Sequence, residues 1–311
     1  MHKFLQGFLP NFYRGDWKNG ENDAATFPLP NGDTLCFTTD SFVVNPLFFP
    51  GGNIGDLAFA GTINDLVVMG ADPIGLSCSV IIEEGLAEEK FLEVMQSLAD
   101  LSQQYQIPVV TGDTKVMEKG SLDKLVINTA GVGIAKQILE TPLNIGDKII
   151  VSGGIGEHGV ALLSERFDFQ TEIVSDTKPL VTEMKAIRSQ IKWAKDPTRG
   201  GLAAAVNEVA TDQNLVFTLN QDQIPIKKAV RTAGELLGID VFSLACEGCC
   251  ISWCTPEQAE SVVTELKKHN PLACIIGEIT DHKPGGQVIL QTGLGRRFLS
   301  MPRGKIVPRI C

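Results

Sequence analysis

The stretch IGDLAFAGTINDLVVM, residues 54–69, is apolar along most of its length and is as long as an ordinary globular helix. Its apolar residues fall on all sides of such a helix, so the pattern predicts a helix buried in the protein. Asp65 lies inside it, where an unpaired carboxylate would be costly. The common roles of an aspartate, capping a helix or beginning a turn, therefore explain Asp65 least well.

Short apolar runs alternate with helical stretches around this helix. We predict an amphipathic helix over 88–104, because Phe91, Met95 and Leu98 share one face at the helical period. Strands are predicted at 34–39, 74–82, 108–111 and 124–134. Residues 141–147 combine several turn formers. We therefore place the end of a first domain, residues 1–145, at this turn.

A second block follows, which we assign to a domain of residues 146–299. Its predicted strands are 148–151, 215–219, 248–253, 273–278 and 287–291. Its predicted helices are 160–167, 201–211, 227–237 and 256–269. The fold class is therefore α+β with two domains. Residues 300–311 contain two prolines and a glycine, so we expect a mobile C-terminal tail that ends in Cys311.

The composition excludes several classes of partner. The chain has 311 residues, 43% of them hydrophobic, and a formal net charge of -10. Nucleic acids and anionic membranes need clustered Lys and Arg, so we expect neither as a partner. The first residues lack the apolar region of a signal peptide, and no apolar run is long enough to span a membrane. We expect a cytoplasmic protein.

Two local patterns have a functional and a structural interpretation. Four of the eight cysteines lie close together, at Cys246, Cys249, Cys250 and Cys254. A zinc site or a regulatory disulfide is one interpretation, but the second, separated ligand pair of a zinc site is missing, so we favour a buried strand. Residues 154–159 match G-x-G-x-x-G, but no regular βαβ series follows, so we favour a tight turn whose amides could hold an anion.

A set of carboxylates is harder to explain structurally. Its members lie at expected strand ends or beside small residues: Asp23, Asp40, Asp65, Asp113 and Asp196. Such positions let oxygen ligands approach a hard cation that carries nucleotide phosphates, and Lys115 would add a fixed positive charge. Glu247 lies in an apolar run, where burial would raise its pKa unless it is paired. It suits proton transfer or a structural ion pair, and the sequence leaves both open.

Taken together, the motifs give a full-length resemblance. They are NDAA (22–25), TTDSFVV (38–44), PGGNIG (50–55), GTINDL (61–66), TGDTKV (111–116), DPTRGGL (196–202), ACEG (245–248) and the terminal PRIC (308–311). In this order the chain resembles the HypE family of hydrogenase maturation factors, the carbamoyl dehydratases of the AIR-synthase-like (PurM-like) superfamily. Two features depart from the family pattern: Asn22 replaces a common acid, and Cys249-Cys250 replaces polar residues.

The resemblance implies an architecture and a ligand set. The N-terminal domains would form a barrel shared by a homodimer, with ATP and Mg²⁺ between the two domains near the dimer interface. The implied metal ligands are Asp23, Asp40, Asp65 and Asp196. The implied ATP and phosphate contacts are Asp40, Asn64, Asp65, Gly112, Asp113 and Thr114.

It also implies a reaction. A HypF-like carbamoyltransferase would load a carbamoyl group on Cys311, and ATP would phosphorylate the carboxamide oxygen. Loss of phosphate would leave a thiocyanate, whose cyanide passes to iron on a HypC–HypD scaffold for a [NiFe] hydrogenase. Lys115 would stabilise the charge on the phosphorylated oxygen, and Glu247 would remove the amide proton.

Two other functional classes could account for parts of this pattern: other ATP-using enzymes of the superfamily, and a non-catalytic metal-holding protein. Selenophosphate synthetase, aminoimidazole ribonucleotide synthetase and thiamin monophosphate kinase share the superfamily's ATP site. The first would need a reactive cysteine in a glycine-rich N-terminal segment, whereas Cys36 lies in an expected strand, and the others have no use for a terminal cysteine. A non-catalytic maturation partner that only holds a metal would bind zinc or iron tightly and turn over no ATP.

Overall fold

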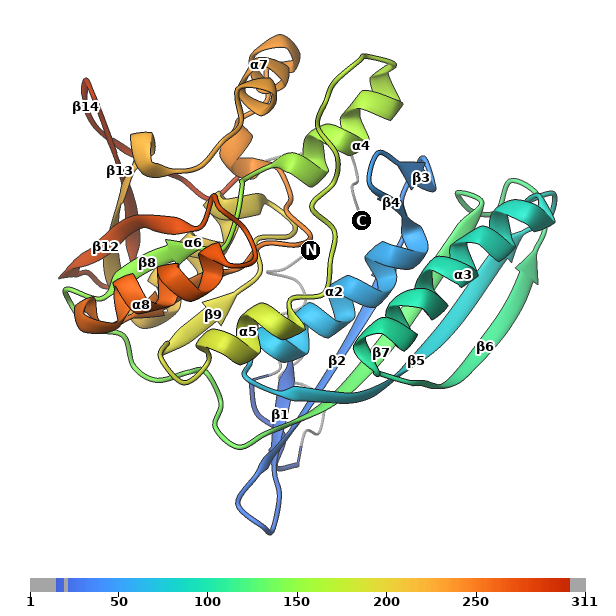
Figure 1. Cartoon of the computed structure of the whole chain (residues 1–311), viewed down its shortest axis with the longest axis horizontal. Helices are drawn as coiled ribbons and strands as arrows, with labels where there is room; N and C mark the ends of the chain where they lie inside the picture. Colours follow the sequence, from blue (N-terminus) through green and yellow to red (C-terminus); the bar gives the residue numbers. More distant parts are fainter. Residues whose placement is uncertain (1–14, 20–21, 303–311) are drawn as a thin grey trace.

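The computed structural model describes residues 15–19 and 22–302. Its elements form two blocks, each built on one sheet, with α2 (Ile54–Val68) at the centre of the molecule between them (Figure 1). The first sheet has the order β1-β2-β7-β5-β6. Its strands are β1 (Ala25–Pro28), β2 (Thr34–Phe42), β7 (Leu125–Ala135), β5 (Asp72–Glu83) and β6 (Val109–Met117).

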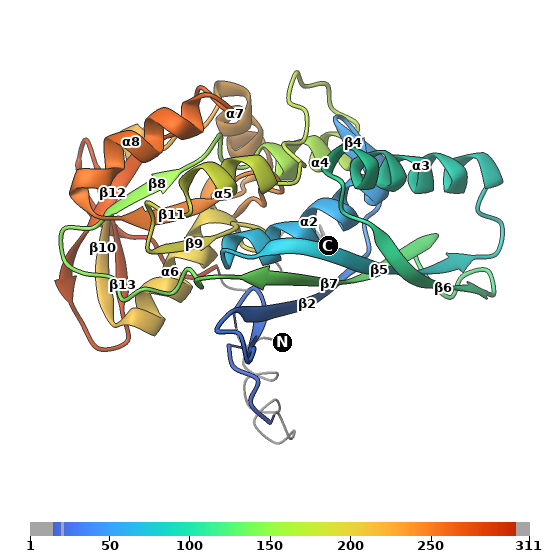
Figure 2. The same cartoon turned by 60° about the horizontal axis from the view of Figure 1, so that its bottom comes forward.

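One face of this sheet is covered by α2 and by α3 (Glu88–Tyr105), as Figure 2 shows. β5 and β6 are parallel neighbours because α3 carries the chain back between them, and the other pairs are antiparallel. The N-terminus of α2 is fixed by a capping box: Asn53 Oδ1 accepts from the Gly55 amide at 2.7 Å, and Asp56 accepts from the Asn53 amide at 2.8 Å. The chain enters α2 through a short hairpin, β3 (Phe48–Phe49) and β4 (Gly52–Asn53).

The second sheet has the order β14-β13-β10-β12-β8-β11-β9. Its strands are β8 (Lys148–Val151), β9 (Trp193–Lys195), β10 (Leu215–Asn220), β11 (Ile251–Cys254), β12 (Cys274–His282), β13 (Gln287–Thr292) and β14 (Gly295–Phe298). The helices of this block are α4 (Glu157–Phe167), α5 (Val181–Ile187), α6 (Gly201–Gln213), α7 (Lys228–Leu237) and α8 (Pro256–Lys267), with two 3₁₀ turns at Gln221–Gln223 and Val241–Ser243. Trp253 and Phe217 pack together in its core at 5.9 Å between ring centroids.

The two blocks share an apolar core. One continuous cluster of buried side chains contains Val68 of α2, Met184 of α5 and Val262 of α8. Val68 and Val262 are both fully buried, so separating the blocks would expose a large apolar area. α2 therefore joins the two blocks at the centre of the molecule. It is also the helix with the most pronounced apolar pattern in the sequence.

Most of the expected elements are confirmed, and the α+β class holds. The strand predicted at 248–253 is present, but its predicted start was wrong: residues 247 and 248 form a bend, and β11 begins at Ile251. The apolar pattern before β11 reflects burial in a loop between the two blocks, which periodicity cannot distinguish from a buried strand. β6 extends beyond the predicted strand as far as Met117, while β1, β9, β14, the β3–β4 hairpin and α5 were not predicted. Cys311 and most of the expected tail lie outside the described residues.

The residues that the structure describes contain no helix long and apolar enough to cross a membrane.

The close packing of α2 on α3 predicts the effect of one added methyl group. A Cβ at Gly55 would lie 2.2 Å from the carbonyl oxygen of Val94, so Gly55→Ala must push the two helices apart. Alanine is intrinsically the better helix former, by about 1 kcal/mol, but overpacking costs about 1–3 kcal/mol. We expect a net loss in the free energy of unfolding, measured by urea denaturation. Gly293→Ala, where a Cβ meets nothing within 4 Å, is the matched control and should change it little. A stabilised Gly55→Ala protein would contradict the packing described.

Candidate active site

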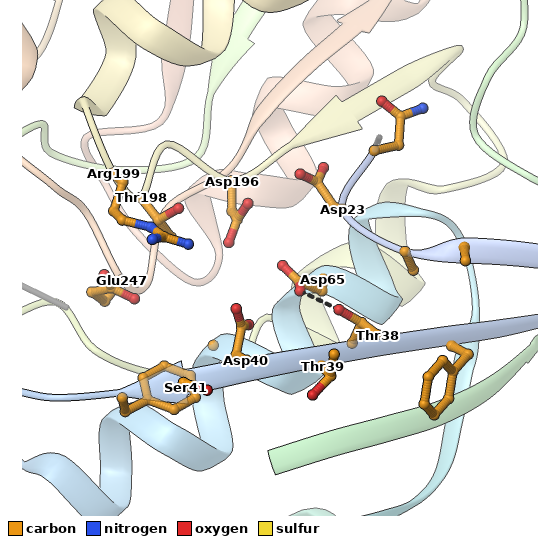
Figure 3. A pocket seen from close by; sticks show the side chains of 16 residues that line it. Asp23, Thr38, Thr39, Asp40, Ser41, Asp65, Asp196, Thr198, Arg199 and Glu247 are labelled. Carbon is orange, nitrogen blue, oxygen red and sulfur yellow. Dashed lines mark hydrogen bonds between the residues drawn. The ribbon is translucent and has the colours of Figure 1, made fainter. Parts of the chain in front are cut away.

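A cleft of about 450 Å³ lies where the two blocks meet (Figure 3). The first block lines it with residues of β2 and α2 and with Asp23, which precedes β1. The second block lines it with the segment that joins β9 to α6 and with Glu247 in the bend before β11. The cleft therefore exists only because both blocks are present.

Carboxylates gather at one end of this cleft. Oxygens of Asp23, Asp65 and Asp196 lie within 4.8 Å of one another. Asp40 of β2 lines the same cleft, facing Asp65 of α2 in Figure 3. Thr38, two residues before Asp40 and therefore on the same face of β2, donates its hydroxyl to Asp65 at 2.6 Å. The four metal ligands expected from the sequence thus come together, although they lie up to 173 positions apart in the chain, from Asp23 to Asp196.

Ionisation of these clustered carboxyl groups is unfavourable. Burial, followed by repulsion from Asp40, Asp196 and Asp23, raises the pKa of Asp65 well above its usual value. Burial and the neighbouring Asp23 raise the pKa of Asp196 to about 8. Burial also raises the pKa of Asp40, although Arg199 opposes the shift. Carboxylates held together in this way need a positive charge between them, as a bound divalent cation would provide.

Two cations already face the carboxylates. Lys195, at the end of β9, pairs with Asp23 and lies 3.5 Å from Glu208. Burial lowers the pKa of Lys195, but the attraction of Asp23 and Glu208 outweighs burial and raises it overall. Arg199 lies on the other side of the cleft, beside Thr198 and near Glu247 (Figure 3). Its guanidinium could bind a phosphate, since a planar donor fork suits phosphate oxygens.

The three clustered aspartates are suitable ligands for Mg²⁺. Mg²⁺ prefers oxygen ligands and is usually bound by one or two carboxylates together with substrate phosphates. The cleft offers carboxylate oxygens at one end and Arg199 at the other. A nucleotide polyphosphate could therefore lie between them.

Glu247 is buried, with 3% of its surface exposed, yet it lines the cleft. It lies in a bend in the loop before β11. Figure 3 shows its side chain beside Arg199 and across the cleft from Asp40. The position suits a group that exchanges a proton with a ligand in the cleft.

Other predicted site residues lie elsewhere. Asn64 is adjacent to Asp65 but is 1% exposed, and its amide is bonded to backbone groups of Lys178, Leu180 and Glu247 instead of lining the cleft. Gly112, Asp113, Thr114 and Lys115 all lie on β6, where every residue is exposed. Because β6 is separated from β2 by β7 and β5, the same chain cannot bring these residues into the cleft. Cys311 lies outside the described residues.

The cysteine cluster is not a metal site in the described part of the chain. All four cysteines are buried, and burial raises the pKa of each thiol, that of Cys254 to about 11. Among the residues described, the side chains able to ligate a metal come within ligand distance only at Asp23, Asp65 and Asp196. The burial that we favoured is confirmed, but the strand is not: only Cys254 lies in β11, and the other three cysteines lie in the loop before it. The glycine-rich run is a tight turn, with Gly156 at φ 81° immediately before α4.

Several cleft residues were missed by the sequence analysis. Arg199 and Thr198 belong to the DPTRGGL motif, which was considered only for Asp196, so the signal was present. Lys195 directly precedes that motif. Asn22, noted as a departure from the family pattern, donates to Glu140, as does Asn19 at 2.6 Å. Its partner could not be found from local sequence, because Glu140 is 118 positions away.

The two blocks correspond to the two domains of the AIR synthase related proteins. The family model for the N-terminal domain matches residues 21–135, and the model for the C-terminal domain matches residues 144–289. Within that class, the chain is similar to named HypE proteins. The carbamoyl dehydratase HypE of Rhizobium leguminosarum bv. viciae is 40% identical over 100% of this chain and 92% of its own length. This chain therefore belongs to the HypE family.

Solved structures agree with that assignment. The HypE–HypF complex contains a chain with a TM-score of 0.88 and 35% identity, over 96% of this chain and 99% of that one. A hydrogenase maturation protein HypE in complex with ATP has a TM-score of 0.84 and 35% identity, over 99% of this chain and 92% of that one. A thiamin monophosphate kinase of Aquifex aeolicus, 16% identical with a TM-score of 0.69, shares the fold.

The raised pKa values predict that metal binding depends on pH. A cation binds carboxylates in their ionised form, so it must displace the protons that the cluster retains near neutral pH. Raising the pH from about 6 to about 8.5 should strengthen Mn²⁺ binding in the presence of a non-hydrolysable ATP analogue by about tenfold or more. Calorimetry in two buffers of different ionisation enthalpy should show proton release.

Asp65→Asn should weaken this binding by at least about tenfold, because it removes one ligand charge from the cluster. Asp33→Asn, which changes a carboxylate outside the cleft, is the control and should bind as the wild type does. Binding that is equally strong at both pH values would contradict the carboxylate site.

Proposed function

We propose that this protein uses ATP to dehydrate a carbamoyl group carried on the Cys311 thiol, forming a protein thiocyanate. The cyanide would then pass to the iron of a [NiFe] hydrogenase active site. The observation that supports this most is the meeting of a carboxylate cluster suited to Mg²⁺ and nucleotide phosphates with a buried glutamate in one cleft. The relatives' name, carbamoyl dehydratase, describes the same chemistry.

The reaction needs each of these parts. The carboxamide oxygen attacks the γ-phosphorus of ATP, the bond to the β-phosphate breaks, and ADP leaves. The nitrogen loses a proton as the O-phosphorylated intermediate forms. Removal of its second proton then drives cleavage of the C–O bond, giving the nitrile and inorganic phosphate. ATP thus converts an oxygen that leaves poorly into phosphate, which leaves easily.

The residues of the cleft divide between the two halves of this reaction. Asp23, Asp65 and Asp196, with Asp40 beside them, would hold Mg²⁺, which neutralises polyphosphate charge when bound. Arg199 would bind phosphate oxygens and stabilise the negative charge that develops on them. Glu247 would accept the second nitrogen proton, whose removal from the O-phosphorylated intermediate drives cleavage of the C–O bond.

The alternatives lose support. A selenophosphate synthetase needs a reactive N-terminal cysteine, whereas Cys36 is fully buried and burial raises the pKa of its thiol to about 12. A non-catalytic metal holder would be expected to use the cysteine cluster, whose described thiols are buried and not arranged at ligand distance.

The experiment is an intact-mass measurement on protein carbamoylated at its terminus and then incubated with Mg·ATP. We expect the loss of one water, confined to a peptide that ends in Cys311. Glu247→Gln should slow that loss by about 100-fold or more, because removal of a general base commonly costs that much. Glu89→Gln, at an exposed position on α3, is the control. No loss of water from the wild-type protein would refute the proposal.

We also propose that the active unit is a homodimer. The face of the first sheet opposite α2 and α3 is covered by none of the described helices, and it carries Phe37, 41% exposed. Cross-strand register places Lys115 on this same face, through Ile81 and Val126. β6 is also an exposed edge strand, with Val110 and Val116 each more than 60% exposed. An edge of this kind is normally covered.

A second copy against this face would explain the position of Lys115. It would let Lys115 of one subunit reach the cleft of the other, as the predicted role requires. Asp113 lies on the same face, paired across the strands with Ser79. The site would then be complete only in the dimer.

Mixing two inactive variants tests this arrangement. Lys115→Ala and Asp65→Asn homodimers should each be inactive. If the site is shared, subunit exchange between them should restore about one quarter of the wild-type rate, because half of the dimers are mixed and each mixed dimer has one intact site. Lys119→Ala, on the loop that follows β6, should leave the rate unchanged. No recovery after confirmed subunit exchange would show that Lys115 does not act across the interface.

We further propose that a HypF-like carbamoyltransferase supplies the carbamoyl group and that a HypC–HypD complex receives the cyanide. A HypE–HypF complex has been solved for a relative. A cytoplasmic location remains a prediction from the sequence.

A further inference from the structure

Glu247 and Gly248 are neighbours in the chain but line two different cavities. Glu247 lines the large cleft. Gly248 lines a smaller hollow of about 180 Å³, together with Asp176 and Lys178. Neither of these two residues lines the large cleft, so they contact Glu247 from outside that cleft.

Asp176 binds the peptide that joins Glu247 to Gly248 with both carboxylate oxygens. Oδ1 accepts a hydrogen bond from the Glu247 amide, and Oδ2 accepts one from the Gly248 amide, each at 3.1 Å. Two successive amides that point at one carboxylate are satisfied best when that carboxylate is ionised. Burial raises the pKa of Asp176 to about 6, although these two donors oppose the shift. The ionised form is therefore the major one at neutral pH.

Asn64 holds the same peptide from the other block. Its side-chain amide donates to the carbonyl oxygens of Glu247 and Lys178, each at 3.2 Å, and accepts from the Leu180 amide at 2.8 Å. Asn64 is the residue before Asp65 on α2. The helix that carries a carboxylate of the cluster thus also holds the main chain of Glu247.

The fit around this peptide is tight. A Cβ at Gly248 would lie 1.7 Å from the carbonyl oxygen of Asp176, so the segment 173–180, which we call the strap, rests directly on the peptide. The strap is anchored in turn, because the Ser175 amide donates to the Pro50 carbonyl at 2.7 Å and its hydroxyl contacts buried His158 at 2.8 Å. Glu247 is therefore held at both its amide and its carbonyl.

We infer that Asp176 and Asn64 are positioning residues, which fix the main chain of Glu247 so that its carboxylate meets the nitrogen proton of the carbamoyl group. The inference rests on the proposed function. A general base must come within about 2.6–3.2 Å of the atom whose proton it removes. A displacement of about 1 Å can cost a factor of ~100 in rate. Neither residue lines the cleft in which the substrate would bind.

The two halves of the reaction allow this role to be measured. Phosphorylation of the carboxamide depends on the carboxylate cluster, whereas elimination depends on Glu247. If Glu247 is misplaced, the phosphorylated intermediate persists, and water returns it to the carbamoyl form by attack at phosphorus. ATP is then consumed without formation of thiocyanate. The ratio of ADP formed to thiocyanate formed reports the position of Glu247.

Asp176→Asn places an amide donor against one of the two backbone amides. We expect the ADP-to-thiocyanate ratio to rise by about tenfold or more, with an unchanged KM for ATP. Asn64→Asp keeps the acceptor for Leu180 but loses the donor to Glu247, and should raise the ratio as well. Asp176→Glu, which retains the carboxylate, should restore part of the coupling. Glu157→Gln is the matched control: it changes a buried carboxylate of the same hollow that pairs with Lys227, and should leave the ratio unchanged.

The outcomes are distinct. A wild-type protein that forms no thiocyanate refutes the proposed function itself. If the wild type is active and both positioning variants keep the wild-type ratio, the inference is wrong. It is equally wrong if ADP and thiocyanate fall in parallel, because that result indicates a purely structural role. If Asp176→Asn does not fold, Asn64→Asp decides the question alone.

Discussion

The repulsion among four carboxylates is the constraint on which the rest of this structure depends. Asp23, Asp40, Asp65 and Asp196 line one cleft, where burial raises the pKa of the last three. Such a cluster persists only where packing elsewhere outweighs its cost. The apolar contacts of α2 with α5, and of α5 with α8, provide that packing. The same repulsion among the carboxylates would favour the binding of a cation between them.

The parts of the fold that local pattern controls were predicted well. α2 and α3 were found within one residue at each end, because each carries an apolar pattern that no other element type explains. The carboxylates that meet in the cleft were singled out for a related reason: a carboxylate beside small or apolar residues is unusual wherever it occurs. The bend at Glu247 was misjudged, because a buried loop and a buried strand share an apolar composition.

Pairings between distant segments could not be predicted. Asp176 precedes Glu247 by 71 positions and Asn64 precedes it by 183, and neither spacing has a local signature. The family resemblance implied that Asn64 contacts phosphate, as Asp65 does, yet a one-residue step on a helix turns a side chain by about 100° and gives it different neighbours. Lys115 shows the complementary difficulty: it is exposed on β6, and in the proposed homodimer its neighbours would belong to another chain, which local sequence does not reveal.

The bonds made by Asn64 have a mechanical consequence. They cross the joint between the two sheets at the wall of the cleft, beside an apolar core that also crosses it. Opening the cleft by a hinge at this junction would have to break these hydrogen bonds and expose part of the apolar core, so the contacts oppose such a motion. In the proposed function, the movement between the carbamoyltransferase, the cleft and the iron scaffold would then be made by the segment that carries Cys311, and not by the walls of the cleft.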